Sequence, residues 1–173
     1  MANAHSEHQE QAHVVLALSQ HVLRLYGLLD QRLGPALTRH GLTRAELDVL
    51  GALASSGAPY ELRPKELRTR LLLTTGGVSN VLRRLEARGL VSSNPDPADG
   101  RGQLVRLTAE GSATARSAAV AATAALERAL SPVPYETLAD ALHLLHGILS
   151  TIDERAPLSL QPPRPSDGRL YPS

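Results

Sequence analysis

Residues 74–88 are expected to form a helix with one face suited to contacting DNA bases. Val78, Leu82 and Leu85 recur at helical spacing, so they are predicted to share a buried face. An Asn amide can bond adenine, an Arg guanidinium can bond guanine or grip a phosphate, and small residues permit a close approach to the groove. The opposite face carries such side chains, namely Thr75, Gly76, Ser79, Asn80 and Arg83.

A second candidate is Arg101, which stands between Gly100 and Gly102. The segment 94–102 is rich in Pro, Gly and Asp and separates two short strand-like runs, Leu90-Val91 and 104–107. This pattern predicts a hairpin with a long exposed tip. An Arg on such a projection is well suited to a narrow groove of high negative potential. We expect Asp96 or Asp99 to hold its stem or to cap turns.

The elements that must position these residues are mostly helical. Apolar spacing predicts an amphipathic helix over 11–33, an interruption at Gly34-Pro35, and a short segment through His40 that Gly41 closes. Thr43 and Glu46 form a capping box for a helix over 44–55.

Helix signals continue beyond this point. Pro64 suits the start of a helix over 64–72, Thr74 is the predicted cap of the next, and Gly89 ends that one. After the hairpin, Thr108 opens an Ala-rich helix that reaches about Leu130, and a last helix runs from 135 to about 154.

The order helix, turn, helix, β-hairpin between Pro64 and Leu107 is the winged helix-turn-helix plan. The fold class expected is therefore mainly α with a small β-hairpin wing, in which a winged helix-turn-helix lobe joins a helical dimerisation region. The expected divisions are a flexible N-terminus (1–10), a dimerisation region (11–40 and 109–155), a DNA-binding lobe (41–108) and a flexible Pro-rich tail (156–173).

The residues 42–111 resemble the DNA-binding core of the multiple-antibiotic-resistance regulator (MarR) family. The similarity is carried by LLLTTGGVSN, by LEARGLV, and by Asp99-x-Arg101 followed by Leu107-Thr108. The resemblance implies an obligate homodimer whose two lobes bind an inverted repeat in double-stranded DNA. It also implies that Arg101 enters the minor groove. The complete set of expected DNA-binding residues is Lys65, Thr74, Thr75, Gly77, Ser79, Asn80, Arg83, Arg84 and Arg101.

Many members of that family are repressors released by a small, often anionic aromatic ligand. The segment AELDVL resembles a urate-responsive branch, but Val81 stands where that branch has Arg, and the chain has no Trp. If an effector pocket exists, the expected lining residues are Tyr26, Arg32, His40 and Asp48. The alternative for two of them is structural, with Tyr26 packing beside Val22 and Asp48 pairing with a nearby Arg.

Other classes of function have weaker support. The pairs His5/His8 and His143/His146 have the i, i+3 spacing of metal ligands but no evident further ligand, so no metal and no cofactor is expected. No G-x-S-x-G, H-E-x-x-H or phosphate-binding loop occurs, so we expect no enzyme. The alternatives to a ligand-released repressor are a ligand-independent or zinc-responsive regulator and a helical dimeric interaction module without strong DNA binding.

Composition agrees with a DNA-binding lobe. Between Tyr60 and Arg106, nine cations and five acids give +4, and the rest of the chain carries −3, so a basic lobe underlies the net charge of +1. The chain has no Cys, which excludes thiol-based sensing. We expect a cytoplasmic protein without a membrane partner, because neither an export signal nor a segment of membrane-spanning length is evident.

Overall fold

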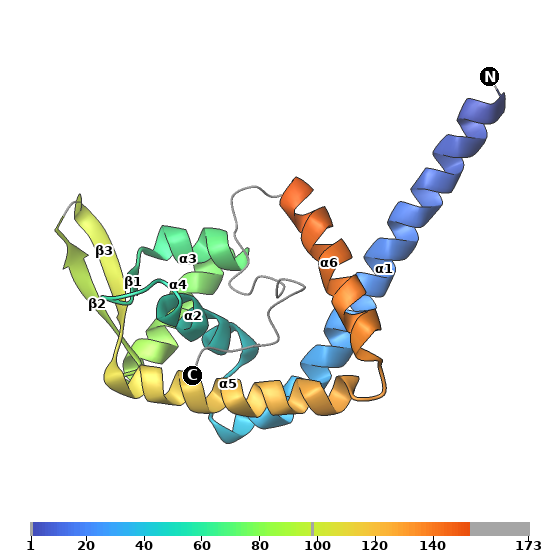
Figure 1. The fold of residues 1–173 in the computed structure, drawn as a ribbon. Helices are drawn as coiled ribbons and strands as arrows, with labels where there is room; N and C mark the ends of the chain where they lie inside the picture. Colours follow the sequence, from blue (N-terminus) through green and yellow to red (C-terminus); the bar gives the residue numbers. More distant parts are fainter. Residues whose placement is uncertain (1, 98, 153–173) are drawn as a thin grey trace.

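The structure, a computed structural model, describes residues 2–97 and 99–152 (Figure 1). A lobe of short helices and a small sheet rests on a long helix, and two further helices extend away from it. The elements are α1 (Ala2–Arg39), α2 (Arg44–Ala54), β1 (Glu61–Leu62), α3 (Pro64–Leu71), α4 (Thr75–Ala87), β2 (Val91–Asp96), β3 (Asp99–Leu107), α5 (Ala109–Leu130) and α6 (Tyr135–Ile152). The predicted fold class is confirmed.

Helix α1 is continuous from Ala2 to Arg39, so two expectations for this region were wrong. The predicted break at Gly34-Pro35 is absent, and the segment expected to be a flexible N-terminus is helical. Pro35 removes one backbone donor, but Leu33 and Leu37 on either side are buried against α5. Packing of this last turn therefore outweighs the local cost of the proline. Gly41, at φ +64°, follows the helix as expected.

The segment Gln9–Thr38 of α1 is long and apolar enough to cross a membrane by length and composition alone. The expectation that no segment reaches that length was therefore wrong. Its C-terminal end packs against α5, where Leu33, Ala36 and Leu37 meet Ala122 and Ala125. The same features fit an amphipathic helix that packs against other helices.

The lobe holds the larger core, formed mainly by α2, α3, α4 and the sheet. Leu50, Leu53, Leu67 and Leu85 are among its fully buried side chains. The predicted capping box opens α2, since the Thr43 side chain accepts from the Glu46 backbone and the Glu46 side chain accepts from the Thr43 backbone. Pro64 opens α3, as predicted.

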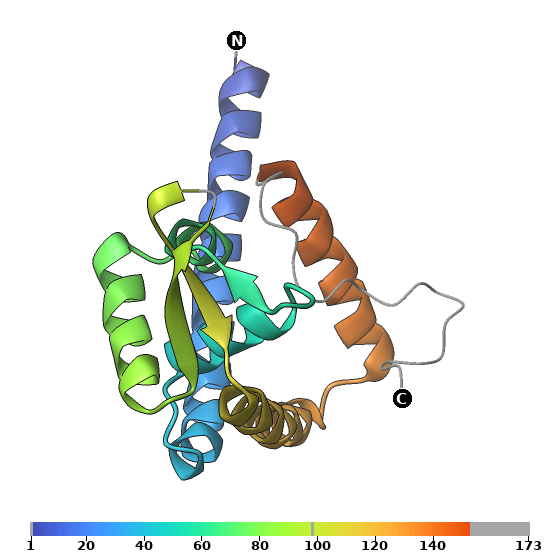
Figure 2. The same cartoon turned by 90° about the vertical axis from the view of Figure 1, so that its left-hand side faces the viewer.

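The sheet has the order β1-β3-β2, with both pairings antiparallel. Strand β1 was not predicted, because two residues carry no periodic signal. The hairpin was predicted with a long tip, which was wrong: β2 runs to Asp96 and β3 resumes at Asp99. The hairpin protrudes from the lobe at the end opposite α1 and points toward the viewer in Figure 2.

Helix α5 joins the lobe to α1. Thr108 caps it and also donates its hydroxyl to the carbonyl oxygen of Gly89 at 2.8 Å. Gly111 sits so close to the start of β2 that an added Cβ would lie 1.9 Å from the carbonyl oxygen of Leu90. The N-terminal half of α5 therefore completes the lobe core, and its C-terminal half packs on α1.

Helix α6 buries none of its side chains, and it stands apart from the lobe in both views (Figures 1 and 2). Leu144 is 69% exposed on it, and Leu23 is 70% exposed on α1. These helices leave apolar side chains without a partner within the described chain. The expected tail at 156–173 lies outside the described residues.

Candidate nucleic-acid interface

Helix α4 separates an apolar face from a polar one, as its spacing predicted. Val78, Leu82 and Leu85 are buried, while Asn80 and Arg83 are exposed. The side chains of this exposed pair are linked, because Arg83 Nη2 donates to Asn80 Oδ1 at 2.7 Å. The outer ridge thus carries an amide and a guanidinium next to each other, which are the groups that can bond adenine and guanine edges.

Val81 belongs to the buried face, with 4% of its surface exposed. Its side chain therefore contributes to the core and is turned away from the outer ridge. An Arg at this position would not be accommodated without displacing core contacts. The absence of Arg here consequently says nothing against DNA binding.

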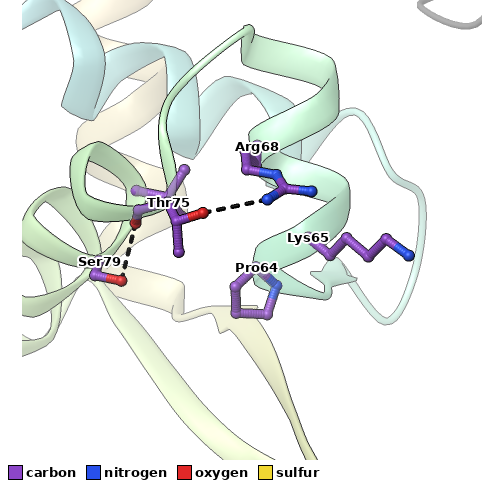
Figure 3. A pocket seen from close by; sticks show the side chains of 6 residues that line it. Pro64, Lys65, Arg68, Thr75 and Ser79 are labelled. Carbon is purple, nitrogen blue, oxygen red and sulfur yellow. Dashed lines mark hydrogen bonds between the residues drawn. The ribbon is translucent and has the colours of Figure 1, made fainter.

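Thr75 and Ser79 lie on the flank of α4 that faces α3, beside the outer ridge. There they line a cavity of about 250 Å³ together with Pro64, Lys65, Arg68 and Val78 (Figure 3). Arg68 Nη1 donates to Thr75 Oγ1 at 3.2 Å, and Ser79 Oγ donates to the Thr75 carbonyl oxygen at 3.0 Å. The hollow between the two helices thus combines hydroxyl groups with two cations, a composition that suits a phosphate group.

Arg68 was not among the predicted site residues. It follows Lys65 by three positions on α3, a spacing that places both on neighbouring parts of one helix face. That spacing could have indicated the pair. The structure adds that α3 turns this face toward the start of α4 (Figure 3).

Thr74 and Gly77 build the start of α4. The Thr74 hydroxyl accepts from the Gly77 backbone N–H at 3.1 Å, which confirms the predicted cap. A Cβ at Gly77 would lie 3.1 Å from that same hydroxyl oxygen. Both residues, expected to bind DNA, therefore have a structural role in setting where the helix begins.

Arg84 is placed differently from its expected role as a DNA contact. Its Nε donates to Glu46 Oε1 at 2.8 Å, and Glu46 is buried at the start of α2. Arg88 Nη1 also lies 4.0 Å from Glu46 Oε2 and donates to the Gly41 carbonyl oxygen at 2.7 Å. These two arginines hold α4 against the α1–α2 junction, which the sequence did not reveal because the partners are distant along the chain.

The carboxylate of Glu46 is held in its charged form. Burial alone would raise the pKa of Glu46, but hydrogen bonds from the Thr43 backbone N–H and from Arg84 outweigh it. The pKa of this carboxyl therefore lies below its ordinary value of 4.5. The contact stays ionic throughout the neutral pH range.

Four cations of the lobe make no ion pair with the described carboxylates. All four are exposed and lie on α3 and α4, whereas the other described arginines between Tyr60 and Arg106 each pair with an acid. Unpaired, solvated cations on one helix pair provide the charge that a phosphate backbone requires. They are Lys65, Arg68, Arg70 and Arg83.

Arg101 lies on β3, near the end of the protruding hairpin. The position agrees with the expected wing contact as far as the backbone is concerned. Of the two acids expected at the stem, Asp96 is buried and accepts from Arg63 Nε at 2.6 Å.

A second cavity, of about 230 Å³, lies where α1, α2 and α5 meet. It brings together two of the predicted effector residues, Tyr26 and Asp48, but neither Arg32 nor His40. His40 instead lies 3.0 Å from Ser117 Oγ on α5 through Nε2, and Arg32 is exposed.

Arg44 lines this cavity as well, and its Nε donates to Asp48 Oδ1 at 3.0 Å. The predicted pairing of Asp48 with a nearby Arg is therefore confirmed. The i, i+4 spacing of Arg44 and Asp48 was the available signal for including Arg44 among the pocket residues.

The described part of the chain brings no three His, Asp or Glu side chains together in a group that could hold a metal ion. The pair His143/His146 on α6 thus gains no third ligand there. The side chains of His5 and His8 lie outside what the structure describes.

Comparison with known proteins identifies relatives of this lobe. A family model described as the MarR family matches residues 40–102. The HTH-type transcriptional regulator PecS of Dickeya dadantii is 31% identical over 84 residues, which cover 49% of this chain and 51% of PecS. The chain thus spans about half the length of the curated relatives it matches.

Solved structures extend the similarity beyond the lobe. Wild-type MarR of E. coli in its apo form is 25% identical with a TM-score of 0.68, and the match covers 76% of this chain and 96% of that one. A MarR family transcriptional regulator of Streptomyces coelicolor, solved in complex with DNA, is 25% identical with a TM-score of 0.70 and covers 82% and 94%. The shared lobe and the shared helical frame together show that the chain belongs to the MarR family.

Proposed function

We propose that this protein is a dimeric, sequence-specific regulator of transcription that binds an inverted repeat in double-stranded DNA. The observation that carries the proposal is the set of unpaired cations on α3 and α4 beside the polar ridge of α4. The titles of two similar structures, from E. coli and from Streptomyces coelicolor, name complexes with DNA. No enzymatic activity is expected, because MarR family members are transcriptional regulators.

In this proposal the outer ridge of α4 enters the major groove. Asn80 and Arg83 would bond base edges, while Lys65, Arg68, Thr75 and Ser79 would hold a backbone phosphate at the hollow between α3 and α4. Arg101 on the wing would reach the minor groove. Thr74, Gly77 and Arg84 would act by fixing the position of α4.

The exposed apolar side chains of α1 and α6 support a homodimer. Val14, Leu23 and Leu144 are each more than half exposed, and these helices do not enter the lobe core. A second copy of the chain could cover both helices, because a two-fold axis presents the same surface on each subunit. Two lobes would then meet successive major grooves roughly 34 Å apart.

We infer further that the protein acts as a repressor released by a small anionic or phenolic compound at the cavity between α1, α2 and α5. Its volume, about 230 Å³, lies below the usual range for ligand pockets and suits a compound with one ring. Arg44 would bind the carboxylate or phenolate, in competition with Asp48. The cavity touches α2, whose Glu46 holds Arg84 of α4, so occupancy could alter the position of α4.

The decisive experiment is a titration of the full-length protein against the DNA that flanks its own gene, followed by fluorescence anisotropy. We expect a complex that resists nonspecific competitor and weakens steeply with salt, by close to one unit of slope in log K against log salt for each phosphate neutralised. Absence of such a complex would favour the interaction module. Addition of hydroxybenzoates should release the DNA from the parent protein but not from an Arg44→Ala variant.

A DNA-binding role places the protein with the chromosome in the cytoplasm. The zinc-responsive alternative predicts that Zn²⁺ alone changes the affinity for this DNA. The ligand-independent alternative predicts that no small molecule does.

A further inference from the structure

Asp96 is one of two acidic residues that the described chain buries, and it lies near the outer end of the wing. Its side chain is 2% exposed and accepts from Arg63 Nε at 2.6 Å. Arg63 follows β1 directly and is the N-cap residue of α3, where its backbone N–H donates to Glu66 Oε2 at 2.7 Å. The contact therefore joins the end of β2 to the point where the sheet meets the helix-turn-helix pair.

The ladder between β2 and β3 is irregular at this contact. Pro95 is opposite Gln103, whereas Asp96, the next residue, is opposite Asp99. Residues 100–102 of β3 thus form a bulge beside Asp96, and Arg101 is at its centre. A bulge changes the direction and twist of a strand, so the backbone that carries Arg101 depends on how this irregular turn of the ladder is held.

The outer part of the wing has little other support. β1 pairs with β3 only through Glu61 opposite Arg106 and Leu62 opposite Val105, near the root of the hairpin. A two-stranded hairpin without a third strand is marginally stable in water. Arg63 comes directly after β1 and reaches beyond the end of this short strand, so it extends support toward the tip.

The chemistry of the pair makes the contact selective for one arrangement. A buried carboxylate is costly unless it is paired, and an Arg guanidinium forms a charge-assisted hydrogen bond with it. If the wing moved away from α3, Asp96 would lose that partner. The position of the wing is therefore coupled to the position of α3.

We propose that Arg63 and Asp96 are positioning residues that clasp the wing to α3 and hold the bulge bearing Arg101 in register with α4 on the same duplex. This rests on the proposed function, in that Arg101 contacts DNA. Asp96 adds a negative charge to a basic lobe, and the clasp explains why that charge is placed there. Arg63 acts through Asp96 and need not touch the DNA.

The first test uses the sign of the effect. Asp96→Asn keeps the shape of the side chain and removes a negative charge, so electrostatics alone would tighten binding to the flanking DNA. The clasp predicts the opposite, a loss of about tenfold, comparable to the loss of one specific contact. Tighter or unchanged binding by this variant would overturn the proposal.

The second test is a double-mutant cycle between the clasp and the wing contact. Arg63→Ala and Arg101→Ala should each weaken binding by about tenfold, and the double variant should be hardly weaker than either one, because both remove the same contact. If the losses multiply and each lowers the salt slope by about one unit, Arg63 is itself a phosphate contact and the clasp is wrong. Arg106→Ala is the matched control, since Arg106 pairs with Glu61 at the root of the same sheet. It should leave the coupling unchanged.

The clasp can also be measured without DNA. Hydrogen exchange of the full-length protein should be faster in the hairpin, residues 91–107, in Asp96→Asn and in Arg63→Ala than in Arg106→Ala, with unchanged protection of α2. Equal exchange in the parent and the Asp96 variant would overturn the proposal. Failure of the parent to bind DNA would refute the proposed function and leave this exchange measurement as the test of the clasp.

Discussion

On the outer ridge of α4, Arg83 Nη2 donates to Asn80 Oδ1 at 2.7 Å, one helical turn away. Bidentate contact with adenine uses the amide oxygen of Asn as an acceptor, so in the free protein Arg83 occupies an atom that adenine recognition would need. The two side chains are therefore coupled before any base is present. Base recognition by one of them involves a change in the contacts of the other.

Asn80→Ala should reduce discrimination between the operator and random DNA more than it reduces affinity for random DNA. Loss of one bidentate base contact costs about 1–3 kcal/mol at its own base pair. Competition titrations with operator and scrambled duplexes measure both affinities. An equal loss on the two duplexes would make Asn80 a backbone contact.

Arg101→Ala should weaken binding to all duplexes and leave the unfolding transition nearly unchanged. The reason is that a wing cation near the minor groove contributes through phosphate charge and groove potential. Arg128→Ala is the matched control, because Arg128 is an exposed cation toward the far end of α5. Anisotropy at several salt concentrations distinguishes the two. Operator binding at the parental level by the Arg101 variant would exclude the wing contact.

The faces of α4 could be predicted from the sequence because helical periodicity decides which side chains meet the core. Pro35 shows the limit of local rules, since the break it predicts is prevented by contacts of Leu33 and Leu37 with α5, about ninety positions away. The roles of Arg84 and Asp96 depend in the same way on Glu46 and Arg63. Residue type indicates that such charges need partners, but only the folded chain determines which partners they meet.

Glu46→Gln should lower the free energy of unfolding at neutral pH by about 1.5–3 kcal/mol, the range for hydrogen bonds to charged groups. The pKa of Glu46 is lower in the folded than in the unfolded chain, so its contribution is complete above about pH 4.5 and is lost as the pH falls through the folded value. The difference between parent and variant should therefore shrink below pH 4.5. Urea unfolding at pH 7 and pH 3.5 measures it, with Glu127→Gln, an exposed acid on α5, as the control. A difference that does not depend on pH would contradict the ionic contact.

Gly111→Ala should destabilise the lobe by about 2–3 kcal/mol, because its Cβ would lie 1.9 Å from the backbone oxygen of Leu90 and the first turn of α5 would have to move. Gly51→Ala is the matched control, since a Cβ at this position of α2 meets nothing within 4 Å. That variant should gain up to about 1 kcal/mol from helix propensity. Thermal and urea unfolding should give opposite signs for the two substitutions, and equal effects would contradict the close packing of α5 on β2.

Leu23→Glu combined with Leu144→Glu should convert the dimer to a monomer and abolish cooperative binding to the inverted repeat. Both side chains are about 70% exposed on helices outside the lobe core, and a charge buried without a partner at a subunit interface is costly. Leu72→Glu is the control, because Leu72 is 81% exposed at the turn between α3 and α4, away from α1 and α6. Analytical ultracentrifugation determines the mass of each variant. A dimer that survives the paired substitution would show that the subunits associate through another surface, while a monomeric Leu72 variant would place the interface on the lobe.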